Sequence, residues 1–247
     1  MTDDQLLRYS RQIMLPEVDV AGQESLVAGT ALIIGMGGLG APAAVYLASA
    51  GVGHLVIVDH DRVEASNLQR QIVHHDATIG QTKVASARQS LLQTNPETRI
   101  TAIDHKLESD ELLRTVAGAD VVLDATDNFA ARFAVNAACW EAGVPLVSGA
   151  AIRWEGQVAV FDPRDAESPC YQCLYAEGQD ETLNCAENGV IAPLVGIIGT
   201  CQAMEAIKLL TGVGETLTGR VLYFDAKRMD WRKLKLPKDP ACPNCSA

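Results

Sequence analysis

Short apolar runs alternate with helix-length segments along the first 150 residues. Apolar runs of this length, bounded by turn residues, predict buried strands. We place these strands at 31–34, 55–58, 99–106, 121–123 and 145–148. Strands joined by connections of helical length predict a doubly wound, mostly parallel Rossmann-like α/β sheet with right-handed crossovers.

The rhythm changes after residue 150. Two further strands, at 157–161 and 221–225, favour antiparallel pairing. Between them lie a polar stretch at 162–188 and a long apolar helix at 193–210. Gly196 and Gly199 predict that this helix packs closely against another backbone. The sheet is therefore expected to continue with antiparallel strands in the C-terminal part.

A glycine-rich turn follows the first strand. Gly35, Gly37 and Gly40 stand in G-x-G-x-x-G register, and the second strand ends in Asp59. Glycines let the backbone approach a phosphate, the following helix offers free N–H groups, and the acid takes ribose hydroxyls. The motif predicts a nucleotide site but does not choose between a dinucleotide and ATP. A tight turn without a ligand is the other interpretation.

Charged side chains follow the second and fourth strands. Arg70 and Lys83 lie beyond Asp59, where they could reach phosphates, although each taken singly reads as a surface charge. Asp127 follows the fourth strand at the edge where ligands bind in open α/β sheets. It could hold Mg²⁺, or it could cap the next helix together with Asn128.

Four of the seven cysteines form two C-x-x-C pairs, Cys170 with Cys173 and Cys242 with Cys245. In a reducing compartment, two such pairs favour one tetrahedral zinc site over disulfides or a redox dithiol. This site would be closed and structural, and it would pin the C-terminal tail to the polar stretch.

The remaining cysteines are Cys139, Cys185 and Cys201. Cys139 and Cys201 fall on apolar helix faces and are expected in the core. Cys185 lies in the polar stretch, where it is either a bystander thiol or a nucleophile in thioester or persulfide chemistry. His74 and His75 are interpreted as surface or packing residues, because no metal-ligand partner lies at suitable spacing.

Composition excludes several classes of protein. The net charge of −11 argues against a nucleic-acid partner, which needs basic patches. No uninterrupted apolar run reaches the ~18 residues of a membrane helix, and the N-terminus has no signal-peptide pattern. We expect a cytoplasmic protein that contacts no membrane.

The motifs together resemble a known family. They are RYSRQI, GMGGLG, VDHD, SNLQR, Lys83, ATDN, SGAAIRWEGQV, CYQC and CPNC. This set is similar to the ThiF/HesA-type adenylyltransferases, relatives of ubiquitin-activating enzyme that activate small ubiquitin-like sulfur carriers. The resemblance covers nearly the whole chain. It is greatest to members that serve molybdopterin synthase in molybdenum cofactor biosynthesis, with the thiamine pathway next.

The resemblance implies ATP, Mg²⁺ and Zn²⁺ as cofactors and assigns roles to residues. Gly38 would lie on the nucleotide, Asp59 would bind the ribose, and Asp127 would ligate Mg²⁺. The implied nucleotide-binding set is Gly38, Asp59, Ser66, Asn67, Leu68, Gln69, Arg70, Lys83, Asp127 and Asn128. Its catalytic residues would be Arg11, Arg70, Lys83, Asp127 and, in some members, Cys185. Zinc ligands would be Cys170, Cys173, Cys242 and Cys245.

The resemblance also implies partners. Its substrate would be the C-terminal Gly-Gly carboxylate of a sulfur-carrier protein, adenylated with release of pyrophosphate. Arg11 would enter the active site of the other subunit of a homodimer. Because the chain stops soon after Cys245, we expect a separate sulfur donor, a cysteine desulfurase or a rhodanese-like protein. An NAD-dependent oxidoreductase is the more distant alternative.

We expect a single adenylyltransferase domain over 1–247, since no linker interrupts it. It would comprise an N-terminal helical arm (1–29), a nucleotide-binding half (30–150) and a carrier-binding, zinc-containing half (151–247).

Overall fold

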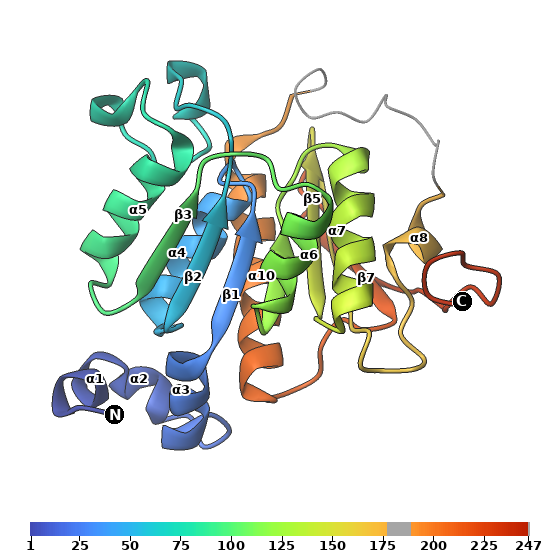
Figure 1. The fold of residues 1–247 in the computed structure, drawn as a ribbon, viewed down its shortest axis with the longest axis horizontal. Helices are drawn as coiled ribbons and strands as arrows, with labels where there is room; N and C mark the ends of the chain where they lie inside the picture. Colours follow the sequence, from blue (N-terminus) through green and yellow to red (C-terminus); the bar gives the residue numbers. More distant parts are fainter. Residues whose placement is uncertain (177–188, 247) are drawn as a thin grey trace.

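The computed structural model describes residues 1–176 and 189–246, and their strands form one eight-stranded sheet (Figure 1). The strands are β1 (Thr30–Ile34), β2 (His54–Val58), β3 (Arg99–Ile103), β4 (Val121–Asp124), β5 (Leu146–Ile152), β6 (Glu155–Phe161), β7 (Arg220–Asp225) and β8 (Asp230–Lys235). Their order is β3-β2-β1-β4-β5-β6-β7-β8. The pairs from β3 to β5 are parallel and those from β5 to β8 are antiparallel, which confirms the predicted fold class.

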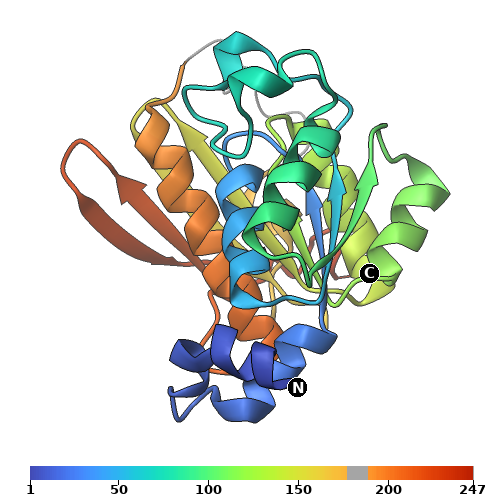
Figure 2. The same cartoon turned by 90° about the vertical axis from the view of Figure 1, so that its left-hand side faces the viewer.

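Helices cover both faces of the parallel part. The α-helices of the described residues are α1 (Asp3–Arg8), α2 (Ser10–Ile13), α3 (Asp19–Ala28), α4 (Gly40–Ala50), α5 (Lys83–Thr94), α6 (Ser109–Ala117), α7 (Phe129–Ala142), α8 (Tyr171–Leu174) and α10 (Ala192–Thr211). Core residues of α4, α5 and α10 gather on one face, and those of α6 and α7 on the other (Figures 1 and 2). Alternate residues of β1 enter the two cores, which explains why this strand is apolar from Ala31 to Ile34.

Among the described helices, α10 is long and apolar enough to span a membrane by length and composition. It nevertheless packs against α4 and against β5 and β6, with its central residues in the core. Its apolar character is thus accounted for by its place between α4 and the sheet.

Two glycines of α10 have different surroundings. A Cβ at Gly199 would lie 2.2 Å from the carbonyl oxygen of Leu39, so glycine alone allows α10 to approach the start of α4 this closely. A Cβ at Gly196 would have no atom within 4 Å. The prediction of close packing is confirmed for Gly199 and wrong for Gly196.

Other differences from the predicted elements lie at their ends. The third strand ends at Ile103 instead of Lys106, because the polar residues that follow leave the sheet edge and turn toward a cavity. The fifth strand extends to Ile152 through its pairing with β6. Strand β8, which the sequence did not predict, ends the sheet in a hairpin that projects from the body (Figure 2). Its residues are mostly exposed and charged.

Candidate nucleotide site and four-cysteine cluster

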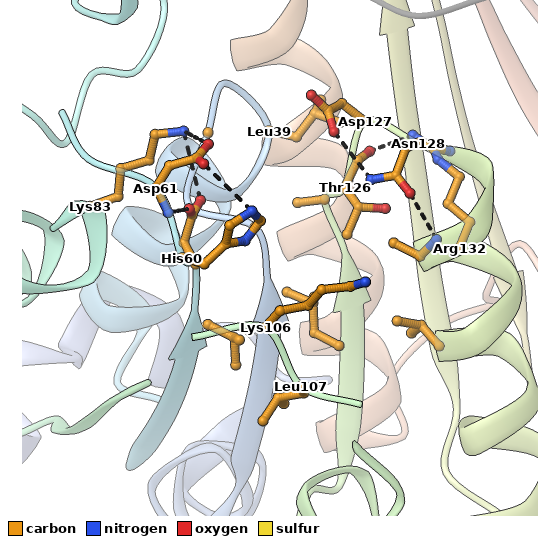
Figure 3. A pocket seen from close by; sticks show the side chains of 18 of the residues that line it. Leu39, His60, Asp61, Lys83, Lys106, Leu107, Thr126, Asp127, Asn128 and Arg132 are labelled. Carbon is orange, nitrogen blue, oxygen red and sulfur yellow. Dashed lines mark hydrogen bonds and ion pairs between the residues drawn. The ribbon is translucent and has the colours of Figure 1, made fainter. Parts of the chain in front are cut away.

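A cavity of about 400 Å³ opens at the carboxyl ends of β1, β2 and β4 (Figure 3). This edge is where open α/β sheets bind ligands. Six residues of the predicted nucleotide-binding set line it: Gly38, Asp59, Arg70, Lys83, Asp127 and Asn128. Residues that are far apart in the sequence therefore meet around one space, as the strand-end argument predicts.

The glycine turn from β1 into α4 is shaped by backbone contacts. Gly35 has a φ of +97°, a conformation that residues with a side chain rarely adopt. A Cβ at Gly40 would lie 1.8 Å from the carbonyl oxygen of Gly35. Within the described residues, no side chain caps the N-terminus of α4. Its Ala41 N–H already donates to the Gly37 carbonyl at 3.0 Å and Pro42 has no N–H, so it is mainly the positive end of the helix dipole that would favour an anion in the cavity.

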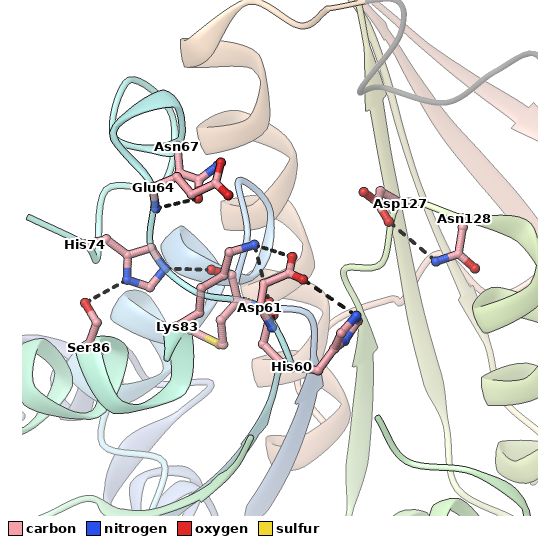
Figure 4. A network of polar contacts seen from close by, with 11 residues as sticks. His60, Asp61, Glu64, Asn67, His74, Lys83, Ser86, Asp127 and Asn128 are labelled. Atoms are coloured by element: carbon pink, nitrogen blue, oxygen red, sulfur yellow. Dashed lines mark hydrogen bonds and ion pairs between the residues drawn. The ribbon is translucent and has the colours of Figure 1, made fainter. Parts of the chain in front are cut away.

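The peptide of Met36 in this turn is held on both sides. The Asp59 carboxylate accepts a hydrogen bond from the Met36 N–H at 2.8 Å, and one from the Asp61 N–H at 2.9 Å. The Nε2 of His74 donates to the Met36 carbonyl at 3.0 Å, and its Nδ1 lies 2.9 Å from the Ser86 hydroxyl (Figure 4). His74 is thus a buried packing residue that links the turn to α5.

Lys83 is buried at the start of α5 and faces two acids. Its Nζ lies 2.8 Å from an oxygen of Asp61 and 3.9 Å from an oxygen of Asp59. Partial burial acts to raise the pKa of Asp61, but the hydrogen bond and charge of Lys83 hold it below its ordinary value. Asp61 was not predicted as a site residue, although it is the second acid of the VDHD motif and lies three residues after the end of β2.

Within the SNLQR segment, Arg70 is the residue that lines the cavity. Its guanidinium donates to the Ser66 carbonyl at 3.1 Å, and the Asn67 side chain accepts from the Glu64 N–H at 3.1 Å (Figure 4). Ser66 and Asn67 therefore stabilise the turn from which Arg70 extends. Leu68 is half-buried and Gln69 is exposed, and neither lines the cavity.

The structure separates the two roles that the sequence left open for Asp127 and Asn128. Asn128 is the N-cap of α7, because its side-chain oxygen accepts from the Ala131 N–H at 2.9 Å. Asp127 is exposed at the cavity, 3.5 Å from the Asn128 amide. An exposed carboxylate at the edge of a cavity is a type of ligand that Mg²⁺ takes in proteins, so the position of Asp127 is compatible with the predicted role.

Three further cavity residues were not predicted: Lys106, Arg132 and Gln71. Lys106 follows β3, and Arg132 lies one turn into α7 (Figure 3). The Arg132 guanidinium is buried and donates to the Thr126 carbonyl at 2.7 Å. Burial acts to lower its pKa, but the nearby Asp124 and Tyr171 hold the pKa above its ordinary value.

The side chain of Gln71 indicates which kind of ligand the cavity suits. Its Oε1 is buried beside the cavity and has no hydrogen-bond partner among the described residues, so it is an acceptor available to a ligand. Gly37 adjoins it, and a Cβ there would lie 3.6 Å from the Gln71 Nε2. With Arg70, Lys83 and Lys106 around the same space, the residues suit an anionic ligand that also carries hydrogen-bond donors.

Arg11 lies outside this cavity. It is an exposed residue of α2, and its guanidinium lies 4.0 Å from the Met14 sulfur. It lines a separate hollow with Tyr46 and Met204 at the opposite end of the molecule from the glycine turn. Within one chain, Arg11 therefore cannot act on a ligand in the nucleotide cavity.

The four predicted zinc ligands come together. The Cys170 and Cys242 sulfurs lie 3.6 Å apart, and those of Cys173 and Cys245 3.4 Å apart, with all four within 4.8 Å of one another. A tetrahedral zinc with Zn–S bonds of about 2.3 Å separates its sulfurs by about 3.8 Å. The cysteines are unbridged, and their geometry fits zinc.

The other cysteines lie elsewhere. Cys139 is buried in the core, where burial raises the pKa of its thiol. Cys201 packs against the core from α10. Both positions confirm the predicted packing role. Cys185 lies outside the described residues.

Comparison with known proteins agrees with this architecture. The ThiF family model matches residues 9–244. The chain is 51% identical to the "Molybdopterin-synthase adenylyltransferase" of Escherichia coli over 99% of this chain and 98% of that protein. It is 46% identical to the "Sulfur carrier protein ThiS adenylyltransferase" of the same organism, over 99% of this chain and 97% of the relative.

The solved structure of E. coli MccB with ATP has a similar fold. Its TM-score is 0.85 at 23% identity, covering 97% of this chain and 75% of that one. The family match runs from Tyr9 to Asn244 and so includes the cavity and three of the four cysteines, ending one residue before Cys245. The chain therefore belongs to the ThiF family.

Proposed function

We propose that this protein is an adenylyltransferase that activates the C-terminal Gly-Gly carboxylate of a small ubiquitin-like sulfur carrier with ATP. The 51% identity to a molybdopterin-synthase adenylyltransferase favours the small subunit of molybdopterin synthase as that carrier. The 46% identity to a ThiS adenylyltransferase makes the thiamine-pathway carrier the second candidate.

The reaction needs no general base. A C-terminal carboxylate is already ionised at pH 7, so it attacks the α-phosphorus of ATP directly. The new bond joins the carboxylate oxygen to phosphorus, the bond to the pyrophosphate oxygen breaks, and an acyl-adenylate and pyrophosphate result. The protein has to position the reactants and offset their negative charge.

Cations on two sides of the cavity perform this task. Arg70 and Lys83 face it from the β2 side, and Lys106 follows β3. Asp127 would hold Mg²⁺, which would neutralise charge on the phosphates. When phosphates bind, Lys83 is placed to exchange part of its contact with Asp61 for a phosphate oxygen.

The observation that carries this proposal is the meeting of Arg70, Lys83 and Asp127 around the glycine turn. An NAD-dependent oxidoreductase would use the same turn, but it would have no use for a triphosphate-binding lysine and a magnesium carboxylate together. Thermal shift separates the two functions. ATP with Mg²⁺ should raise the Tm of the protein, whereas a rise with NAD alone would contradict the proposal.

The four cysteines would hold a structural zinc. The ion would join the Cys170–Cys173 segment to the C-terminal tail and, with four thiolates, would leave no open position for catalysis. We also propose that the chain is one domain with three parts: an arm (1–29), a nucleotide-binding half (30–150) and a half that holds the zinc and receives the carrier (151–247).

Arg11 would act across a homodimer. It lies in an exposed hollow with apolar neighbours, and the family resemblance implies that this arginine would enter the active site of the other subunit. Mixing an inactive Arg11→Ala chain with an inactive Asp127→Ala chain tests this role. Restored activity in the mixed dimer is expected, and its absence would contradict transfer of Arg11 between subunits. A separate sulfur donor and a cytoplasmic location remain predictions.

Mass spectrometry of the carrier tests the main proposal. The purified protein is mixed with Mg·ATP and either candidate carrier, and the C-terminal glycine is examined for an adenylate. We expect adenylation of the molybdopterin-synthase subunit and a lower yield on the thiamine-pathway carrier. Adenylate on neither carrier, in a protein that binds ATP, would overturn the assignment.

A further inference from the structure

Helix α7 lies between the nucleotide cavity and the four-cysteine cluster. Its N-cap, Asn128, follows Asp127 directly. Arg132 and Asn136, one turn apart on the same face, are both buried. Each makes polar contacts outside the helix, and together these contacts lead from one site to the other.

The cavity side of this connection is formed by Arg132. Its guanidinium donates to the Thr126 carbonyl at 2.7 Å and lies 4.0 Å from the Asp124 carboxylate. Asp124 in turn accepts from the Thr126 N–H at 3.0 Å and from its hydroxyl at 2.7 Å. Thr126 is therefore held on both sides, and Asp127 is the next residue.

The cluster side is formed by Tyr171, the residue after Cys170. Its side chain is buried with its hydroxyl beside Arg132, while its backbone N–H donates to the Asn136 Oδ1 at 2.8 Å. The residue that follows Cys170 is thus fixed to α7 through its backbone, and its hydroxyl lies beside the Arg132 side chain of the same helix.

A second observation concerns the side-chain amide of Asn136. Because its oxygen accepts from Tyr171, its Nδ2 points the other way, where it is buried without a hydrogen-bond partner of good geometry in the described residues. That amide lies close to the Cys170 sulfur, as does the Asn244 amide, whose Nδ2 is likewise buried and unpaired. A thiolate bound to a metal is a strong acceptor, and N–H···S bonds of this kind orient metal ligands.

We propose that α7 couples the metal held by the four cysteines to the nucleotide cavity, with Asn136, Tyr171 and Arg132 as positioning residues. Metal binding would fix the position of Cys170 and of Tyr171, which follows it. Because Tyr171 contacts Asn136 and lies beside Arg132, its position constrains the Arg132 side chain. Arg132 in turn fixes the loop that presents Asp127. The inference rests on the proposed function, since it needs zinc at the cluster and Mg·ATP at the cavity.

Coupling between two sites is reciprocal, so it is measurable without turnover. We would follow zinc release to a chromogenic chelator from the zinc-loaded protein, with and without Mg·ATP. In the wild type, Mg·ATP should tighten zinc binding by about fivefold or more, the lower range of measured site–site couplings, and we expect this gain to appear as slower release. The same samples are assayed for a Tm rise with Mg·ATP.

Tyr171→Phe removes the hydroxyl that contacts Arg132 and keeps the ring packed against Phe133 and Phe161. This variant should bind one zinc, but Mg·ATP should no longer slow its release. Tyr175→Phe is the matched control, because it removes the hydroxyl of a neighbouring ring that accepts from Gln157. It should keep the wild-type effect of Mg·ATP.

Asn136→Leu tests the other step. Loss of its amide should speed zinc release several-fold whether or not the nucleotide is present. Release at the wild-type rate would overturn the role of Asn136.

The outcomes separate the two proposals. A full nucleotide effect in Tyr171→Phe would overturn the coupling through Arg132. A wild type whose Tm rises with Mg·ATP but whose zinc release is unchanged would overturn the coupling and leave the proposed function intact. A wild type whose Tm does not respond to Mg·ATP would contradict the proposed function and the coupling with it.

Discussion

The nucleotide cavity and the four-cysteine cluster are held together by different means. Around the cavity, side chains extend from strand ends, and buried contacts such as those of Asp59 and His74 with Met36 fix the turn. The cysteines lie on two segments outside the sheet, which meet through their sulfurs and through a few hydrogen bonds such as that from the Asp239 N–H to the Cys173 sulfur. The cavity is therefore fixed by buried contacts of the fold itself, whereas we expect a metal to stabilise the cluster.

The largest expected effect separates chemistry from folding at the cavity. Asp127→Ala should lower carrier-dependent exchange of pyrophosphate into ATP by about 100- to 1000-fold, because transition-state charge loses its counterion. The Tm without ligand should stay within about 2 °C of the wild type, since Asp127 is exposed and Asn128 caps α7. Asp110→Ala, an exposed acid on α6, is the control. Near-normal exchange by Asp127→Ala would refute its assigned role.

At the four-cysteine cluster, we expect the substitution to lower the stability of the fold. Cys242→Ser should abolish zinc binding and lower the Tm by about 5–10 °C, corresponding to about 2–3 kcal/mol. Cys201→Ser changes a cysteine of α10 and should retain one zinc per chain. Zinc content by elemental analysis and Tm by calorimetry check both variants. An unchanged Tm in a zinc-free Cys242→Ser protein would show that the metal contributes nothing to the fold.

A smaller effect is expected where α10 packs against the start of α4, beside the cavity. Gly199→Ala places a Cβ against the Leu39 carbonyl at the start of α4, so we expect a loss of about 1–3 kcal/mol and weaker ATP binding. Gly196→Ala, on the same helix with open space around it, should raise stability by about 1 kcal/mol through helix propensity. Equal effects in urea unfolding would contradict the close contact of α10 with α4.

The smallest effect concerns pH. Burial lowers the pKa of His74, and Lys83 and His75 add to this, while the hydrogen bond to Met36 and the charge of Asp59 oppose it. Below about pH 6.5, the unfolded chain binds a proton that folded His74 does not, so stability falls as pH falls from 6.5 toward the folded pKa.

His74→Gln keeps an amide donor for Met36 but cannot titrate. Its free energy of unfolding should fall less steeply than that of the wild type below pH 6.5, and the difference between the two proteins should be constant near pH 8. Parallel curves throughout acid pH would exclude a contribution from His74.

The sequence predicted the parts of the molecule that follow from local pattern. Strand runs, the glycine turn and the paired cysteines each carry their signal within a few residues, and the rule for parallel strand ends brought Asp59 and Asp127 to one edge. This is why Asp59, Arg70, Lys83 and Asp127 line a single cavity, whereas Arg11 does not.

The unpredicted parts depend on packing between distant segments. The sequence gives no sign that Arg132 differs from other helix residues, because its contacts with Asp124 and Thr126 form only in the folded protein. Gly196 and Gly199 carry the same signal, and only the position of α4 distinguishes them. Strand β8 was missed because its charged, exposed sequence lacks the apolar alternation of a buried strand.

That last strand has a consequence for behaviour at high concentration. A terminal strand presents unpaired N–H and carbonyl groups, on which a second molecule is able to build a continuous fibril-like ladder. The outer strand here carries Arg232, Lys233 and Lys235, all exposed. Like charges facing each other across such a ladder repel, so these cations act as gatekeepers against aggregation.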